Sequence, residues 1–116
     1  MSALLALQWE FAEAEARLIQ QAVALGYKVS KGECWRSPEQ AQIDADKGSG
    51  VAHSLHTERL ATDLLLFKDG VYLTETADYV TLGAWWKSQG PAYCWGGDFS
   101  RPDGDHFSIT PDGVHK

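Results

Sequence analysis

Two histidines and an aspartate, in two separated segments of the chain, carry the residue types of a metal site. His56 and Asp63 lie seven residues apart in the first segment, and Asp103 and His106 lie in the second. Two imidazoles and a carboxylate fill three corners of a tetrahedron and leave the fourth for water, as in a catalytic zinc site. Zinc lowers the pKa of that water, and a nearby carboxylate can accept its proton as it attacks a carbonyl. The pattern predicts zinc-dependent hydrolysis, with Asp103 as the general base.

Three other residues, Asp105, His53 and His115, are of types that could take these roles. Asp105 is a second candidate base, but it adjoins His106 on a predicted strand, where successive side chains point to opposite faces. Asp103 can instead lean over the metal, so we expect Asp105 to be a turn or surface carboxylate. His53 and His115 are expected to face solvent.

Arg36 and Ser54 are candidate substrate-binding residues. Arg36 follows a predicted strand, and its planar donors suit a carboxylate or a developing oxyanion. Pairing with a surface acid has comparable weight for Arg36. Ser54, two residues before His56, could hydrogen-bond a substrate or cap the loop. From the residues alone these alternatives stay open.

Length and composition restrict the class of protein. A chain of 116 residues predicts a single domain, 1–116, with no room for a second module. The net charge of −6 argues against nucleic acid as a partner, because phosphate binding needs clusters of Lys and Arg. No stretch approaches the ~20 apolar residues of a membrane span, and no basic region precedes the apolar N-terminus, so neither membrane insertion nor a signal peptide is expected. We expect a monomer in which Cys34 and Cys94 are free thiols, with a single bridge as the alternative.

The rest of the chain supplies the elements that must position the candidate residues. Apolar residues at three- and four-residue steps predict a helix that is capped by Ser2 and stopped by Gly26. Two shorter helices are predicted at 38–47 and 76–89, and the latter begins at Thr76 or Asp78. Strands are predicted at 27–35, 60–67, 71–73, 93–95 and 106–109, with a hairpin turn at 68–70. The order predicts an α+β domain with a small antiparallel sheet, about three helices and the zinc site on the sheet.

Five ordered motifs along the chain are Arg36…Gln40, Ser54-x-His56, Leu60-Ala61-x-Asp63, Trp95-Gly96-Gly97 and Asp103-x-x-His106-Phe107. Together they resemble a known peptidase family. From about residue 27 to 110, the chain is similar to the zinc D-alanyl-D-alanine carboxypeptidase and L-alanyl-D-glutamate endopeptidase family. That family includes vancomycin-resistance carboxypeptidases and phage endolysins, and a hedgehog signalling domain shares its fold. The segment from Ser54 to Leu64 is most similar to the compact phage and prophage versions. For a chain of this family, 116 residues leave no room for a separate cell-wall-binding domain.

The resemblance implies roles for five residues. It implies that His56, Asp63 and His106 bind zinc, that Asp103 is the catalytic base, and that Arg36 helps to polarise the substrate carbonyl. It also implies a peptidoglycan stem peptide as the substrate, cut between L-alanine and D-glutamate by a phage or prophage endolysin. Such an enzyme would be made in the host bacterial cytoplasm and would act on the cell wall after holin-type release.

Some positions depart from the family pattern, and two alternative functions stay open. Many members have Gly at the position of Arg59, and an acidic or amide residue often stands at that of Ser108. Many carboxypeptidases of the family use Glu as the base, so Asp103 favours the phage endopeptidases. The alternatives are a D-Ala-D-Ala carboxypeptidase that trims peptidoglycan and a non-catalytic zinc-binding recognition module. The presence of Asp103 counts against the second alternative, since a structural site needs no base.

Overall fold

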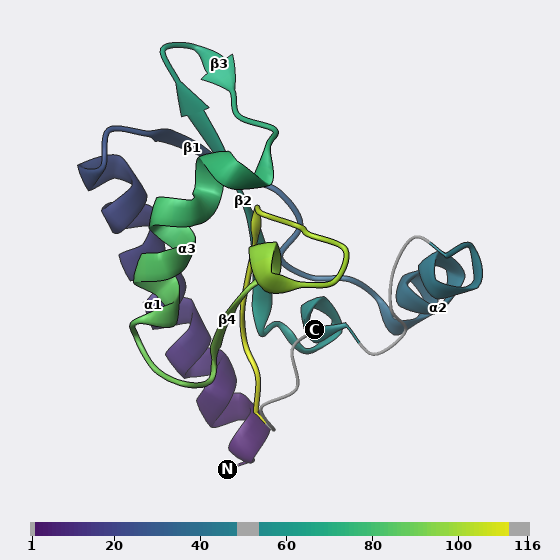
Figure 1. The fold of residues 1–116 in the computed structure, drawn as a ribbon. Coiled ribbons are helices and arrows are strands. Elements are labelled where there is room, and N and C mark those ends of the chain that lie inside the picture. Colours follow the sequence, from purple (N-terminus) through teal and green to yellow (C-terminus); the bar gives the residue numbers. More distant parts are fainter. Residues whose placement is uncertain (1, 49–53, 112–116) are drawn as a thin grey trace.

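Among the described residues, five antiparallel strands form the sheet that carries Asp63 and His106. The computed structural model describes residues 2–48 and 54–111 (Figure 1), so the expectations for His53 and His115 lie outside the described residues. The strand order is β1-β2-β5-β4, and β3 pairs with β2. The strands are β1 Lys28–Lys31, β2 Ala61–Lys68, β3 Val71–Tyr72, β4 Tyr93–Trp95 and β5 His106–Ile109.

Helices α1 (Ala3–Ala24) and α3 (Val80–Lys87) lie side by side against the sheet, and α2 (Pro38–Asp46) lies apart from them (Figure 1). The hydroxyl of Ser2 accepts a hydrogen bond from Leu5 N, so this residue caps α1 as predicted. Gly26 has a φ of +98° just beyond the helix, a conformation that glycine adopts without strain. The predicted α+β fold with a small antiparallel sheet is confirmed within the described residues. No helix among them is both long and apolar enough to cross a membrane.

Trp86 on α3 joins the helical layer to the sheet. Its side chain is fully buried, and its indole N–H donates to the carbonyl oxygens of Cys94 on β4 and Ser108 on β5. The ring also makes edge contacts with Phe11 on α1 and Phe107 on β5. Trp86 is therefore part of the packed core.

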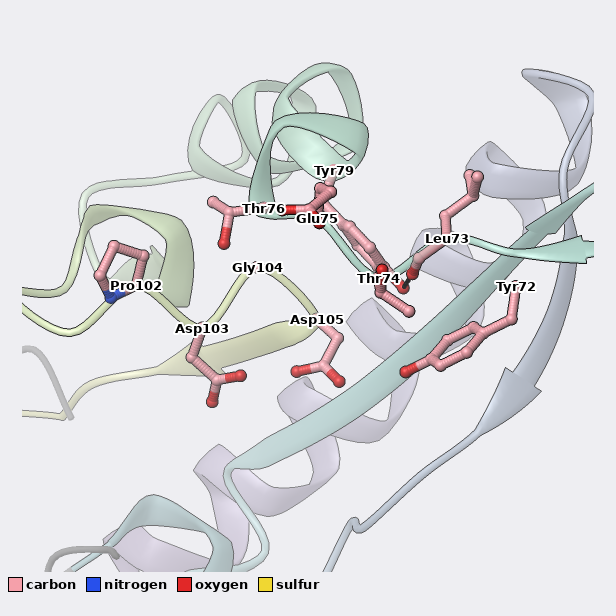
Figure 2. Close-up of a pocket in the computed structure, with 10 residues that line it drawn as sticks. All are labelled: Tyr72, Leu73, Thr74, Glu75, Thr76, Tyr79, Pro102, Asp103, Gly104 and Asp105. Atoms are coloured by element: carbon pink, nitrogen blue, oxygen red, sulfur yellow. Dashed lines mark hydrogen bonds between the residues drawn. The ribbon is translucent and has the colours of Figure 1, made fainter.

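Tyr79 fixes the segment between β3 and α3. The side chain is buried, and its hydroxyl accepts from Leu66 N on β2 and donates to the carbonyl oxygen of Leu73 (Figure 2). Burial raises the pKa of Tyr79 to about 12. The helix predicted for 76–89 is divided here, because a 3-10 turn at Thr76–Tyr79 precedes α3.

Two other local predictions met different outcomes. The hairpin turn at 68–70 is present, and Asp69 and Gly70 both have positive φ, as a tight turn between twisted strands requires. The strand predicted for 27–35 ends at Lys31. Beyond it the chain still pairs with β2, since Gly32 N donates to Asp63 O and Asp63 N donates to Glu33 O, both at 2.8 Å. Cys34 and Cys94 form no disulfide among the described residues; Cys34 is exposed and Cys94 is buried.

Candidate metal centre

The three predicted metal ligands come from a short turn and two neighbouring strands. Asp63 on β2 and His106 on β5 are directly opposite each other in the antiparallel pair. His56 lies in a 3-10 turn, Leu55–Glu58. Ser54 is buried and its hydroxyl accepts from His56 N at 3.2 Å, while Arg59 ends the turn with a φ of 59°. Backbone hydrogen bonds of the sheet and of the turn thus fix the position of each candidate ligand.

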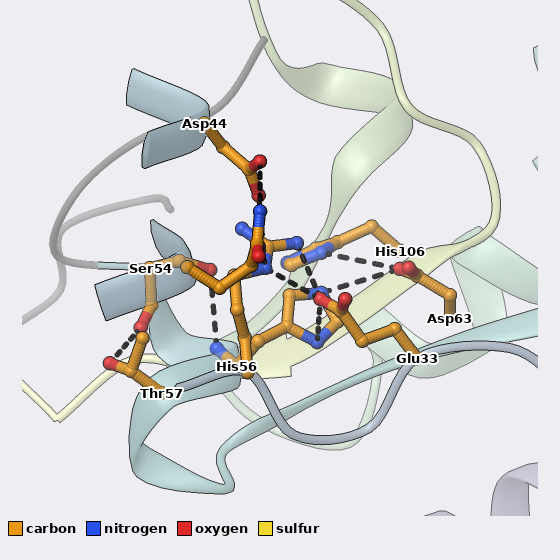
Figure 3. Close-up of polar contacts among 9 residues, drawn as sticks. Glu33, Asp44, Ser54, His56, Thr57, Asp63 and His106 are labelled. Atoms are coloured by element: carbon orange, nitrogen blue, oxygen red, sulfur yellow. Dashed lines mark hydrogen bonds and ion pairs between the residues drawn. The ribbon is translucent and has the colours of Figure 1, made fainter. Parts of the chain in front are cut away.

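Figure 3 shows the ligand atoms of the three side chains turned toward one another. Asp63 Oδ1 lies 3.4 Å from His56 Nε2 and 3.7 Å from His106 Nδ1. All three ligand atoms are within 4.8 Å of one another. Two nitrogens or oxygens bound to one tetrahedral zinc lie about 3.4 Å apart, given bond lengths near 2.1 Å. The spacing of the donors therefore suits a small tetrahedral metal ion.

Burial leaves part of this cluster without hydrogen-bond partners. His56 and His106 are each 3% exposed. Among the residues that the structure describes, neither Asp63 Oδ1 nor His56 Nδ1 has a hydrogen-bond partner, although both atoms are buried. A buried polar atom without a partner is costly, and a cation between the three side chains would satisfy the carboxylate oxygen. The residues present therefore fit a divalent metal.

Arg36 reaches this cluster through an acid that sequence reasoning missed. Its Nε donates to Glu33 Oε1 at 2.7 Å, and its Nη2 lies 2.5 Å from the same oxygen. The same Nε lies 3.9 Å from Asp44 Oδ2. Glu33 Oε1 is also 3.8 Å from His56 Nδ1 (Figure 3). Pairing with an acid was one of the two alternatives for Arg36. The only signal for Glu33 in the sequence is its place three residues before Arg36.

Two further carboxylates adjoin the cluster on the side of Asp63. Ligand atoms of Asp63, Asp103 and Asp105 are all within 4.8 Å of one another. Asp103 is exposed and Asp105 is half-buried. Burial, then a hydrogen bond with Asp103, then the charges of Asp63 and Asp103 raise the pKa of Asp105 to about 8.

Asp105 lies in a turn, as expected, but it is half-buried and is not a surface carboxylate. The alternation of side chains on a strand was the reason for that expectation, but β5 begins only at His106, so Asp105 precedes it. Figure 2 shows the carboxylates of Asp103 and Asp105 projecting from the same side of the loop around Gly104. A polar pocket of about 110 Å³ begins at these two side chains, and its other polar lining residues include Tyr72, Thr74, Glu75 and Thr76.

Comparison with known proteins identifies the family of the chain. The sequence profile of the D-alanyl-D-alanine carboxypeptidase family matches residues 47–109, which include the three candidate ligands and both aspartates. The chain belongs to this family. Its structure is similar to that of the Serratia marcescens L-Ala D-Glu endopeptidase ChiX, with a TM-score of 0.65 and 26% identity over 82% of this chain and 77% of that chain. No curated protein sequence matches the chain. The predicted family resemblance is thereby confirmed, and the protein is a peptidase by family.

In this member of the carboxypeptidase family, two glycines set the loop that carries Asp103. A Cβ at Gly96 would lie 2.2 Å from the carbonyl oxygen of Asp103 and 2.7 Å from Cβ of His106. A Cβ at Gly104 would lie 2.8 Å from the Cα of Thr76. Hydrogen bonds from Asp103 N to Gly96 O and from the indole of Trp95 to Gly104 O, at 2.9 and 2.7 Å, complete the attachment. The loop can approach the sheet this closely only with glycine at both positions.

Proposed function

We propose that this protein is a zinc peptidase that cuts peptidoglycan stem peptides between L-alanine and D-glutamate. The observation that carries the proposal is the convergence of His56, Asp63 and His106 at metal-binding spacing, with Asp103 and Asp105 beside them. Membership of the D-alanyl-D-alanine carboxypeptidase family supports the class of reaction. The similarity to an L-Ala D-Glu endopeptidase supports the bond.

His56 Nε2, Asp63 Oδ1 and His106 Nδ1 are the atoms that would hold the zinc. Two nitrogens and one oxygen leave a fourth position open, as catalytic zinc sites do. When bound, zinc makes water a nucleophile near neutral pH and polarises a carbonyl oxygen.

Asp103 is the proposed general base. Its carboxylate is exposed to an incoming substrate, and it would accept the proton of the attacking water and deliver it to the nitrogen of the leaving amine. Asp105 competes for the same role, because its carboxyl group is hydrogen-bonded to that of Asp103. Substitution at each position decides between them.

Arg36 and Ser54 are the proposed substrate-binding residues. The guanidinium of Arg36 is oriented by Glu33, and we propose that it donates to the carbonyl oxygen as negative charge develops there. Fixed donors of this kind stabilise a transition state more than a mobile side chain does. The hydroxyl of Ser54 accepts from His56 N and so keeps its own proton available for a substrate acceptor.

The choice of an internal bond rests on where cations lie. A carboxypeptidase needs a cation to hold the terminal carboxylate of its substrate. Arg101 is the cation of the loop that joins β4 to β5, and its Nη1 donates to the carbonyl oxygen of Gly48 at 3.0 Å. This contact favours the endopeptidase. The carboxypeptidase is the second candidate, because the family description names that activity.

Digestion of purified peptidoglycan tests the proposal. Mass spectrometry of the muropeptides should detect L-alanine left on muramic acid and released peptides that begin with D-glutamate. His56→Ala provides the inactive control. Free D-alanine as the main product would support the carboxypeptidase instead, and intact muropeptides after treatment with zinc-loaded protein would support a recognition module. We propose that the enzyme acts in phage or prophage lysis after holin-type release. Expression of the protein together with a holin would test this role in cells.

A further inference from the structure

The two ring nitrogens of His56 face different carboxylates. Nε2 is 3.4 Å from Asp63 Oδ1, in the candidate metal centre, whereas Nδ1 is 3.8 Å from Glu33 Oε1 on the opposite side of the ring (Figure 3). The side chain of His56 is buried, and its Nδ1 has no hydrogen-bond partner among the residues described. Buried polar atoms in native proteins nearly always have such a partner. The nearby carboxylate already accepts from Arg36, but its remaining lone pairs make it a further acceptor close to an unsatisfied ring nitrogen.

We propose that Glu33 is a positioning residue of the metal centre. Its carboxylate accepts a hydrogen bond from Nδ1–H of His56, and this bond keeps Nε2 unprotonated and directed toward the metal. A histidine that binds a metal usually donates its other N–H in this way, which fixes its tautomer and orientation and makes it a stronger ligand. The inference rests on the proposed zinc site and adds a residue that acts through one of its ligands.

A small movement of Glu33 is sufficient to form this bond. A hydrogen bond from an imidazole N–H to a carboxylate is about 2.7–2.9 Å long, so the 3.8 Å separation must shorten by about 1 Å. The ring of His56 is buried and confined. The side chain of Glu33 is 39% exposed, so its carboxylate can shift toward the ring. The backbone of Glu33 is already fixed to the centre, since its carbonyl oxygen accepts from Asp63 N at 2.8 Å.

Arg36 restricts the direction of that movement. Its Nε and Nη2 both bind the Glu33 oxygen that faces His56, and its own backbone N donates to the carbonyl oxygen of His56 at 3.2 Å. The guanidinium and the imidazole thus approach one carboxylate oxygen from two sides. Glu33 connects the proposed oxyanion-stabilising residue to a proposed metal ligand, so removing it should disturb both.

Zinc affinity is the first test, measured by competition with a chromophoric chelator. Glu33→Ala should weaken zinc binding by about 10–100-fold, the usual loss when the partner of a metal-binding histidine is removed. Glu33→Gln keeps an acceptor oxygen and should lose less. Glu39→Ala removes the same charge from an exposed site at the start of α2 and should bind zinc like the wild type. Wild-type affinity in Glu33→Ala, or equal losses in Glu33→Ala and Glu39→Ala, would overturn the proposal.

NMR of the zinc-loaded protein provides a second readout that is independent of activity. A Nδ1-bound proton of His56, shielded from exchange, should be visible in the wild type and in Glu33→Gln but should exchange rapidly in Glu33→Ala. An unchanged signal in Glu33→Ala would contradict the assignment. If Glu33→Ala fails to fold, the graded effect of Glu33→Gln on affinity decides. Wild-type protein that binds zinc but leaves peptidoglycan intact would refute the proposed function alone, whereas wild-type protein that binds no zinc would refute both.

Discussion

The candidate metal ligands and the two loop aspartates are neighbours, but different forces hold them. Asp63 and His106 are opposite residues of an antiparallel ladder, so the hydrogen bonds of the sheet set the distance between them. Asp103 and Asp105 lie in a loop whose position depends on close contact between Gly96 and the carbonyl oxygen of Asp103. One group is fixed by secondary structure and the other by tertiary fit.

This difference separates two properties of the protein. Metal binding should depend on the ladder and on the turn that carries His56, and it should tolerate changes in the loop. Proton transfer should depend on the loop, because a base must lie within hydrogen-bond reach of the proton that it accepts. Substitutions should therefore divide into those that remove the metal and those that leave it bound but slow the reaction.

The largest effect is expected from the ladder and from the turn that carries His56. His56→Ala, Asp63→Ala and His106→Ala should each lose zinc, because three protein ligands leave no redundancy. Metal analysis after dialysis measures the zinc content of each variant. His53→Ala and His115→Ala are the controls and should retain zinc. If His53→Ala emptied the centre while His56→Ala did not, the assignment of the ligands would be wrong.

The next effect belongs to the loop. Asp103→Asn should keep the fold and the zinc but lose about 10²–10⁴-fold in turnover, because an amide accepts no proton. Asp105→Asn should lose less. Rates of muropeptide cleavage and zinc content, measured on the same preparations, check both expectations. A larger loss in Asp105→Asn would identify Asp105 as the base. Asp105 is the specific rival because it is half-buried beside Asp63.

Gly96→Ala examines the contact between the two regions. Its new methyl group would meet the carbonyl oxygen of Asp103 and Cβ of His106, so we expect a loss of about 3 kcal/mol in the free energy of unfolding, at the upper end for overpacking. Urea denaturation measures that loss. Gly48→Ala is the control, because a Cβ there meets nothing within 4 Å and only its φ of +75° is unfavourable. Equal destabilisation of the two variants would mean that the loop adjusts freely.

The smallest effect concerns Tyr79, which holds β2 to the wall of the polar pocket. Tyr79→Phe should cost about 1 kcal/mol of stability, because it removes the hydroxyl that joins Leu66 N and Leu73 O, and it should leave zinc affinity unchanged.

Alkaline conditions sharpen this last test. The pKa of Tyr79 is raised from 10.0 to about 12, so the folded protein keeps a proton that the unfolded chain loses. Stability from this group is fully present below pH 10 and falls as pH rises toward 12. Urea midpoints at about pH 9 and about pH 11 should differ more in the wild type than in Tyr79→Phe. The same pH response in both proteins would contradict the role given to the buried hydroxyl.

The sequence was informative where local patterns determine structure. Ser2 and Gly26 mark the ends of a helix through local capping, and the turn before β3 follows from Asp69 and Gly70. The three candidate ligands were also chosen from the sequence, because residue type and spacing carry the chemistry of a metal site.

Features that depend on distant contacts could not be predicted. Glu33 lies beside His56 only because its segment pairs with β2, and no local pattern reveals that pairing. The burial of Asp105 depends on where β5 begins and on a hydrogen bond to Asp103, both of which arise only when the loop packs on the sheet. Asp103 and Asp105 therefore differ through the packing of their loop on the sheet, which no local sequence pattern encodes.

The opposite placement of Asp63 and His106 also determines where the chain can change in length. An extra residue within β2 or β5 would turn every following side chain to the other face of the sheet and separate the ligand pair. The exposed stretch 100–102 has no such constraint, because the turn from Asp103 to His106 and the contacts of Gly96 are re-established after it. Peptide insertions at 100–102 should therefore be accepted with the metal centre intact. This stretch is a natural point at which to graft a new recognition loop beside the candidate metal centre.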